Sequence, residues 1–407
     1  MLSLERIERL QRLTGMLKEA GFEGIRYEIR KEKKRSWNLF RKEVEKHEVS
    51  YEEWACIEAG RNGKRCVTSF QMEDTENDFE SIKAALLGAA AISERSYTYE
   101  PYAGQRGSEK EESGEADEET VIAERLITAE EAACSVPGVA QVSQCAFEVC
   151  EEEVEFWDED QNNLSDNSRY ACARIEVIAG QGEQVFSKAA STCGMGASDI
   201  DWKKFAEEAA EGAVSGLRIT EIRSGKYPVI LKAEAAAEML ETYLPVFDGE
   251  HALDQTGLLY GKEGKKIAAS GLTIRELPHC EKGRVRRSVD DEGVQVREKE
   301  LVKEGVFTTV LCNKNTVGRV STGNGFKHDA QSDVGIQATN VYLSEANGKE
   351  LPLSEMEQRL GEGLLVTEIG GAFAGINLDS GAFSLIAKGR VIRDGKEKEA
   401  FCDDDFG

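Results

Sequence analysis

The chain has 407 residues and a formal net charge of −25, from 51 Lys and Arg against 76 Asp and Glu. So acidic a protein repels nucleic acids and anionic membrane surfaces, and the sequence holds no basic patch large enough to overcome that field. Its 40% hydrophobic and 31% charged residues are typical of a globular protein of two or three domains that needs no disulfide framework.

The N-terminal segment MLSLERIERLQRL lacks the apolar stretch of a signal peptide, and no run of the sequence reaches the length of a membrane span. The ten cysteines include no CxxC pair that would suggest a zinc or redox site. We therefore expect a cytoplasmic protein whose cysteines are reduced core thiols.

The first part of the chain reads as helix, antiparallel strands, helix. Ile7, Leu10, Leu13 and Leu17 repeat with helical spacing and predict a helix that ends near Gly21. Strands are expected at 24–30, 37–43, 47–59 and 64–70, with a second helix at 78–94. The Asn-Gly pair at 62–63 predicts a hairpin turn between the last two strands.

The rest of the chain is richer in strands. Helices are expected at 121–133, 202–217 and 233–242, and a capping box of Ser354 and Glu357 predicts one more. Strands are expected at 141–157, 170–179, 184–190, 227–231, 272–277, 294–302, 306–312, 340–343, 364–369, 383–393 and 396–402. Because the strands rarely alternate with long helices, the pattern favours an α+β fold over a doubly wound parallel sheet.

Charge locates the boundaries. Residues 101–170 hold 4 basic and 19 acidic residues, a net charge of −15, and the stretch 104–120 has almost no apolar content. We therefore expect an N-terminal α+β domain at 1–103, an acidic linker at 104–120, a middle α+β segment at 121–220 and a strand-rich C-terminal domain at 221–407. Apolar residues are interleaved with the acidic residues around Glu151–Glu153, so we expect this run to form the solvent-facing side of a strand pair.

One pair of carboxylates could carry chemistry. Glu234 and Glu238 lie four residues apart on the predicted helix 233–242, so both would point to one face and could share a proton or a cation. His251 and Asp254 follow as conceivable ligands. A solvent-facing pair of glutamates is the commoner outcome on such helices.

Several short motifs, in order and with fitting spacing over nearly the whole chain, resemble the TldD/PmbA family. They are GKYPVIL at 225–231, GKKIA at 264–268, DDEGV at 290–294, STGN at 321–324, TNVYL at 339–343, GEGLLVT at 361–367 and GAFS at 381–384. Gly323, Asn324 and Asn340 belong to these motif loops.

The resemblance implies a zinc-binding HExxxH motif on the helix after the YPVIL-type strand, where two histidines hold the metal and the glutamate activates water. Here the motif positions read Ala233-Glu234-Ala235-Ala236-Ala237-Glu238. Alanine cannot ligate a metal, and Glu238 replaces the second histidine. This departure resembles the PmbA/TldE branch of the family.

The resemblance thus implies the non-catalytic subunit of a cytosolic metallopeptidase complex that degrades or matures peptides, with no cofactor in this chain and zinc in a TldD-like partner. Two alternatives stay open: an independent hydrolase using Glu234, Glu238, His251 and Asp254, and a homodimeric peptide-binding scaffold. The resemblance also implies that the sequence stops short of the family's last elements, which would leave a sheet edge open or covered by a partner.

Overall fold

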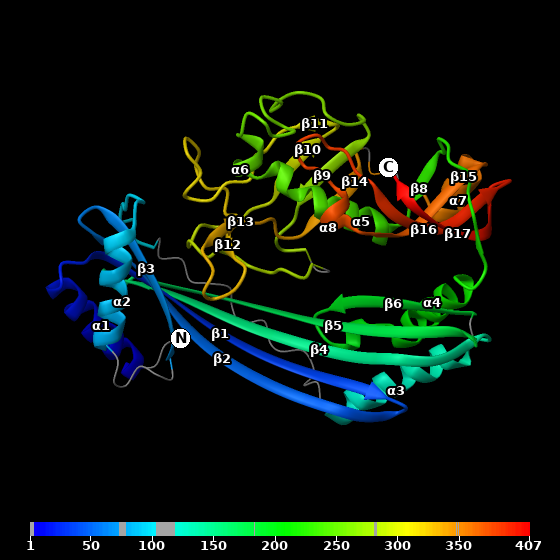
Figure 1. Cartoon of the computed structure of the whole chain (residues 1–407). Coiled ribbons are helices and arrows are strands. Elements are labelled where there is room, and N and C mark those ends of the chain that lie inside the picture. Colours follow the sequence, from blue (N-terminus) through cyan, green and yellow to red (C-terminus); the bar gives the residue numbers. More distant parts are fainter. Residues whose placement is uncertain are drawn as a thin grey trace.

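A computed structural model describes residues 4–72, 79–102, 119–182, 184–280, 283–346, 348 and 350–407. Most of the acidic stretch 104–120 lies outside these residues. Figure 1 shows two layers: a long, curved sheet built by the first half of the chain, and a loop-rich C-terminal part that lies over one face of it.

The long sheet has six antiparallel strands in the order β3-β2-β1-β4-β5-β6. Its strands are β1 (Glu23–Phe40), β2 (Glu43–Arg61), β3 (Lys64–Gln71), β4 (Val139–Asp158), β5 (Asn163–Gln181) and β6 (Gln184–Gly194). The segments on either side of the acidic stretch, which the sequence predicts as separate units, therefore share one sheet: β1 pairs with β4 from Arg26 to Leu39.

Two helices pack at each end of this sheet. They are α1 (Leu4–Glu19) and α2 (Phe79–Ile92) at one end, and α3 (Glu119–Ser135) and α4 (Trp202–Ser215) at the other. Leu10, Leu13 and Leu17 of α1 are buried with Ile25 and Tyr27 of β1, which confirms the predicted helical stripe. The second core joins α3 and α4 to the far ends of β1, β4 and β5.

The sequence predicted two strands, 24–30 and 37–43, where the structure has the single strand β1. The charged segment between the two apolar stretches stays in the sheet because β4 supplies complementary charge: Lys31 lies opposite Glu153, and their side chains are 3.3 Å apart. The chain turns only at Arg41 and Lys42, both with positive φ. The acidic run Glu151–Glu153 lies in a strand pair, as expected, but its side chains are half-buried and not fully solvated.

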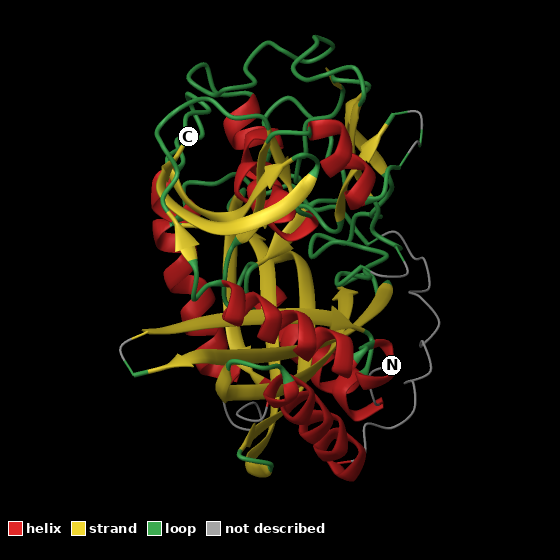
Figure 2. Cartoon of the chain, turned by 90° about the vertical axis from the view of Figure 1, so that its right-hand side faces the viewer, coloured by secondary structure: helices red, strands yellow, loops and turns green. Residues whose placement is uncertain are grey.

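The C-terminal part holds three smaller sheets (Figure 2). The first contains β9 (Leu272–Glu276), β10 (Lys299–Lys303), β11 (Val306–Phe307) and β14 (Val341–Glu345), and the second pairs β12 (Gly325–Lys327) with β13 (Val334–Ile336). The third contains β7 (Ile219–Thr220), β8 (Val229–Leu231), β15 (Gly363–Gly370), β16 (Leu385–Arg393) and β17 (Lys396–Phe406). The edge strand β7 pairs in parallel with β17.

Short helices complete this part: α5 (Ala233–Tyr243), α6 (Gly249–Ala252), α7 (Leu353–Leu360) and α8 (Ala372–Gly375), with 3-10 turns η2 (Ala197–Asp199) and η3 (Leu244–Phe247). The predicted capping box at Ser354 is wrong. The N-cap of α7 is Pro352, and its end makes no side-chain cap hydrogen bond, so Ser354 lies inside the helix. Strand β10 is also shorter than the predicted 294–302, and β11 shorter than 306–312.

Candidate functional site

Helix α5 carries the residues onto which the family resemblance places the zinc motif. It follows β8, which pairs in parallel with β15, and the Lys232 N–H donates to the carbonyl of Val366 on β15 at 2.8 Å. Ala235 is buried against the core of that sheet, whereas Ala233 and Glu234 are exposed. In Figure 1, α5 and α8 lie on the side of the C-terminal part that faces the long sheet.

The two carboxylates of α5 have different surroundings. Glu234 lies 3.5 Å from the ammonium group of Lys232 in an exposed ion pair. Partial burial, together with the neighbouring charges of Glu241 and Glu368, raises the pKa of Glu238. Each carboxylate therefore has its own neighbours.

The two residues suggested as further ligands are engaged locally. The Nδ1 atom of His251 lies 3.0 Å from an oxygen of Asp248, the residue that caps α6. Asp254 accepts hydrogen bonds from the N–H and hydroxyl of Thr256 at 2.7 and 2.6 Å. Within the described ranges, no three His, Cys, Asp or Glu side chains gather in a way that could hold a metal ion.

The zinc that the family resemblance implies does not fit this donor set. A methyl group stands at the first ligand position, a carboxylate beside two other carboxylates stands at the second, and the sequence contains no HExxxH anywhere. We therefore derive no chemical step through a metal in this chain.

The motif-loop residues hold the C-terminal loops together. Asn324 is fully buried and donates to Glu276 at 2.9 Å, while Asn340 bonds the backbone of Val285 in both directions. Gly323 has a φ of +76°, and a Cβ there would lie 2.5 Å from the carbonyl oxygen of Gln295, so only glycine fits. The contacts described here give these three residues a structural role: they hold the C-terminal loops in position.

The edge strand β6 approaches the α5 side of the C-terminal part. Lys188 of β6 forms an ion pair with Glu368 of β15, the same carboxylate that raises the pKa of Glu238. The ammonium group of Lys388 on β16 lies 5.3 Å from the centre of the Phe186 ring. The sequence predicted a strand at 184–190 but not that this strand forms an edge of the sheet near α5. The order of strands in a sheet depends on pairing between segments that are distant in the sequence.

The two open edges of the long sheet differ in charge. Across the described part of the chain, β6 pairs only with β5, and Lys188 is the sole charged residue in QVFSKAASTCG. At the other edge, β3 covers only Trp54 to Arg61 of β2 and leaves the glutamate-rich stretch 43–53 beyond it. Charges usually protect edges from further strand pairing, so β6 is the edge open to an added strand.

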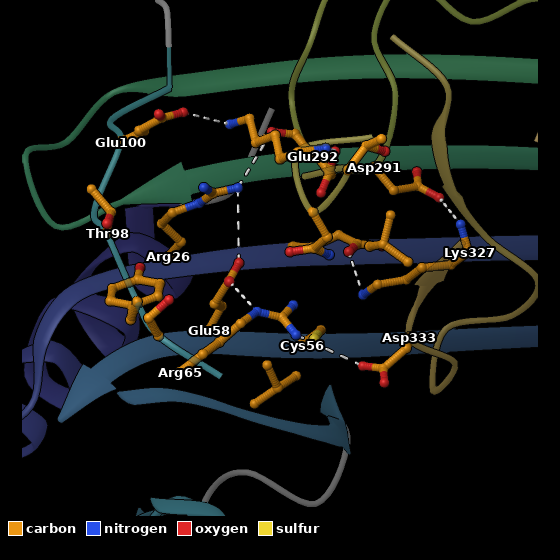
Figure 3. Close-up of a pocket in the computed structure, with 18 of the residues that line it drawn as sticks. Arg26, Cys56, Glu58, Arg65, Thr98, Glu100, Asp291, Glu292, Lys327 and Asp333 are labelled. Atoms are coloured by element: carbon orange, nitrogen blue, oxygen red, sulfur yellow. Dashed lines mark hydrogen bonds and ion pairs between the residues drawn. The ribbon is translucent and has the colours of Figure 1, made fainter. Parts of the chain in front are cut away.

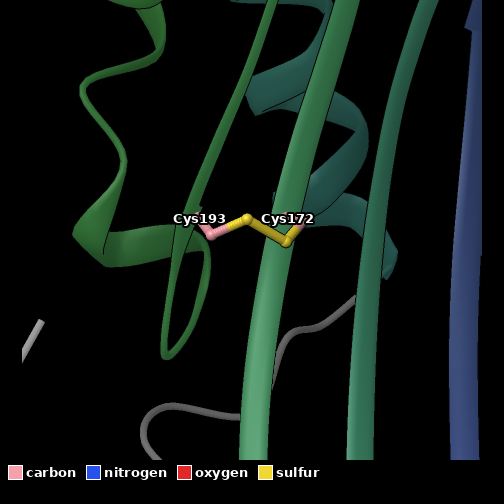
Figure 4. The surroundings of a disulfide bond; sticks show 2 residues. All are labelled: Cys172 and Cys193. Atoms are coloured by element: carbon pink, nitrogen blue, oxygen red, sulfur yellow. A yellow bond between two sulfur atoms is a disulfide. The ribbon is translucent and has the colours of Figure 1, made fainter. Parts of the chain in front are cut away.

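A disulfide joins β6 to β5. Cys172 and Cys193 lie directly opposite each other in the strand pairing and are bonded (Figure 4). The expectation of reduced thiols throughout is wrong for this pair, because cross-strand register brings two cysteines 21 residues apart into contact. The other eight cysteines are not disulfide-bonded, and five of them are buried.

Comparison with known proteins supports the family resemblance. Residues 224–403 match the PmbA/TldA metallopeptidase C-terminal domain. The metalloprotease PmbA of Escherichia coli O157:H7 is 26% identical over 224 residues, which cover 54% of this chain and 46% of that protein. The metalloprotease TldD homologue of Haemophilus influenzae is 25% identical over 204 residues, or 48% of this chain and 42% of that protein. The matched segments thus span less than half the length of these relatives.

Solved structures share the fold over nearly the whole chain. TldE from Thermococcus kodakarensis superposes with a TM-score of 0.82 at 19% identity, covering 97% of this chain and 90% of that one. A Thermotoga maritima protein described as a candidate modulator of a DNA gyrase gives a TM-score of 0.83 at 23% identity, covering 98% and 90%.

Fold and matched domain together define a mixed helix-and-sheet protein with a C-terminal domain of the metallopeptidase type. Residues 224–403 of this chain belong to the PmbA/TldD family.

Proposed function

We propose that this chain is a PmbA/TldE-type, non-catalytic subunit of a cytosolic metallopeptidase complex that degrades or matures peptides. The observation that carries the proposal is the donor set on α5, where Ala233 and Glu238 occupy the positions of the two zinc-binding histidines. Within the described residues no helix is long and apolar enough to cross a membrane.

The β6 edge supplies a role for such a subunit. An extended peptide can add to an open sheet edge through main-chain hydrogen bonds, with little demand on its sequence. The 11 residues of β6 offer such an edge beside α5, and the disulfide and the Lys188–Glu368 ion pair hold it in place. In this proposal the chain presents the peptide, and a TldD-like paralogue with HExxxH supplies the zinc and the hydrolysis.

The test compares the purified chain with its mixture with an HExxxH-bearing paralogue from the same genome. Elemental analysis should find no stoichiometric zinc in the chain alone, and a quenched-fluorescence peptide should be cleaved only by the mixture. Cleavage by the mixture should stop when the glutamate of the partner's HExxxH is replaced by glutamine, and continue when Glu234→Gln is made in this chain.

Two outcomes would overturn the proposal. Stoichiometric zinc in the chain alone, lost on Glu234→Gln or Glu238→Gln, would favour an independent hydrolase that uses those carboxylates with His251 and Asp254. A stable homodimer that binds peptides and ignores every HExxxH paralogue would favour a peptide-binding scaffold. Pull-down of the native complex followed by mass spectrometry separates a paralogue partner from self-association.

A further inference from the structure

A second, polar cleft lies away from α5. It has a volume of about 410 Å³ and opens between the long sheet, the segment 96–102 and the C-terminal segments 291–292, 314–317 and 327–334 (Figure 3). Strands β1, β2 and β3 contribute to its lining. A ligand held here would touch both layers of the molecule.

The cleft is lined by charges of both signs. Its cations are Arg26, Arg65, Lys314 and Lys327, and its carboxylates are Glu28, Glu58, Glu100, Asp291, Glu292 and Asp333. Two of the cations are closely matched: Lys327 pairs with Glu28, and Arg65 with Glu58, both at 2.5 Å. Asp291 is held by two further cations from outside the lining, Arg30 and Arg287.

Arg26 is the cation with the poorest pairing. Its side chain is 7% exposed, yet it lies 3.9 Å from Glu58 and donates to the carbonyl of Glu292 over 3.3 Å. Its Nε has no hydrogen-bond partner among the described residues. The guanidinium lies 4.5 Å from the centre of the Tyr102 ring and also hydrogen-bonds that side chain, so the buried Nε–H is the donor that a planar acceptor such as a carboxylate would satisfy.

The carboxylates with the loosest pairing lie at the mouth. Asp333 and Glu100 have side chains 66% and 64% exposed. Asp333 lies 3.9 Å from Arg65 and 3.6 Å from Arg95, and Glu100 lies 3.4 Å from Lys314. Each of these carboxylates can take up an ammonium group without giving up a short ion pair.

We infer that this cleft binds a small zwitterion of the size of an amino acid or short peptide, with its carboxylate on Arg26 and its ammonium group at the acidic mouth. A plain anion leaves the loosely paired carboxylates at the mouth without a cation, and a plain cation leaves the Arg26 Nε without an acceptor. A molecule with both groups satisfies both ends. The site lies apart from the β6 edge and does not depend on the proposed function.

The test titrates the purified full-length chain by calorimetry with tri-alanine, tri-alanine amide and N-acetyl-tri-alanine. Free tri-alanine should bind with one site, and blocking either end should weaken binding at least about tenfold. L-alanine in a parallel titration shows whether one amino acid suffices. No saturable heat with tri-alanine or L-alanine up to millimolar concentration, or equal binding of the blocked peptides, overturns the inference.

Two variants locate the site. Arg26→Met should abolish binding of tri-alanine, while Glu58 keeps its partner Arg65. Asp333→Asn should weaken the binding of tri-alanine and leave the weak binding of the acetylated peptide unchanged. The reason is that only the ammonium group of the ligand contacts Asp333. Glu263→Gln, in an exposed ion pair with Arg319 outside the cleft lining, is the matched control and should bind as the parent does.

The exposed Asp333 keeps the inference falsifiable if Arg26→Met does not fold. If Asp333→Asn binds tri-alanine as tightly as the parent does, and blocking the amine of the peptide still weakens its binding, the ammonium group does not lie at Asp333. That result would contradict the assigned orientation. Because these titrations need no partner protein and no peptidase assay, their failure leaves the proposed function standing, and the converse holds as well.

Discussion

Arg30 on β1 and Asp291 in a C-terminal loop form a buried ion pair with an N–O distance of 2.8 Å, although 261 residues separate them. Arg287 approaches the other oxygen of the same carboxylate at 2.9 Å. The Asp291 side chain is 1% exposed, so a pair of cations from both layers of the molecule surrounds one buried charge. This contact ties the long sheet to the C-terminal part.

Replacing Asp291 by Asn should destabilise the fold by about 3–5 kcal/mol, because two buried guanidinium groups lose their shared counter-charge. Urea denaturation measures the difference. Glu263→Gln removes one partner of an exposed ion pair with Arg319 and should change stability by less than about 1 kcal/mol. If the two substitutions lower the free energy of unfolding equally, the buried ion pair stabilises the fold no more than the exposed one.

The same contact predicts a dependence of stability on pH. Burial alone would raise the pKa of Asp291, but Arg287 and Arg30 outweigh it and hold that pKa below its ordinary value. A lowered pKa in the folded state means that the contribution of Asp291 is complete at neutral pH and is lost as the pH falls below about 4. Between pH 6 and pH 3 the free energy of unfolding should therefore fall more steeply for the parent than for Asp291→Asn. Parallel curves would contradict this assignment.

A charge placed on the β6 edge should block peptide addition. Ala189 is exposed on β6, and a lysine there would protect the edge as charges do in other sheets. Ala189→Lys should weaken binding of an unfolded peptide at least about tenfold, measured by fluorescence anisotropy. Ser50→Lys, an exposed position on the glutamate-rich β2 edge, should bind like the parent. If both variants lose affinity alike, net charge and not the edge controls binding.

The disulfide predicts a thiol count. Of the ten cysteines in the sequence, two form the disulfide and the other eight are not disulfide-bonded in the structure. Titration of the denatured protein with a thiol reagent should therefore find eight thiols before reduction and ten after it. Peptide mapping of the unreduced protein should recover Cys172 linked to Cys193. A count of ten before reduction would restore the expectation of reduced thiols throughout.

The motif residue Asn324 should matter for stability. It donates to the fully buried carboxylate of Glu276 at 2.9 Å and to the carbonyl of Gln337 at 3.0 Å. Asn324→Ala should cost about 2–3 kcal/mol, since a hydrogen bond to a buried charge is lost. Thermal unfolding measures this loss. The exposed Asn315→Ala is the control for an asparagine in a neighbouring loop, and a matching loss there would argue against a special role for Asn324.

Local patterns predicted much of the fold. The helical stripe of Leu10, Leu13 and Leu17, the Asn62-Gly63 turn and the strand-to-helix passage at 229–243 all depend on neighbours in sequence, and the structure confirms each. The absence of HExxxH is likewise visible in the sequence alone, because it concerns residue identity.

Tertiary structure alone decided the rest, because it depends on pairing between distant segments. The charged middle of β1 stays extended because it pairs with β2 on one side and with β4 on the other, where Glu153 lies opposite Lys31. The order of the strands makes β6 an edge, and its register against β5 brings Cys172 to Cys193. The cleft at Arg26 likewise needs loops from more than 260 residues away. Side-chain periodicity encodes which face of an element is buried, but not which distant element covers it.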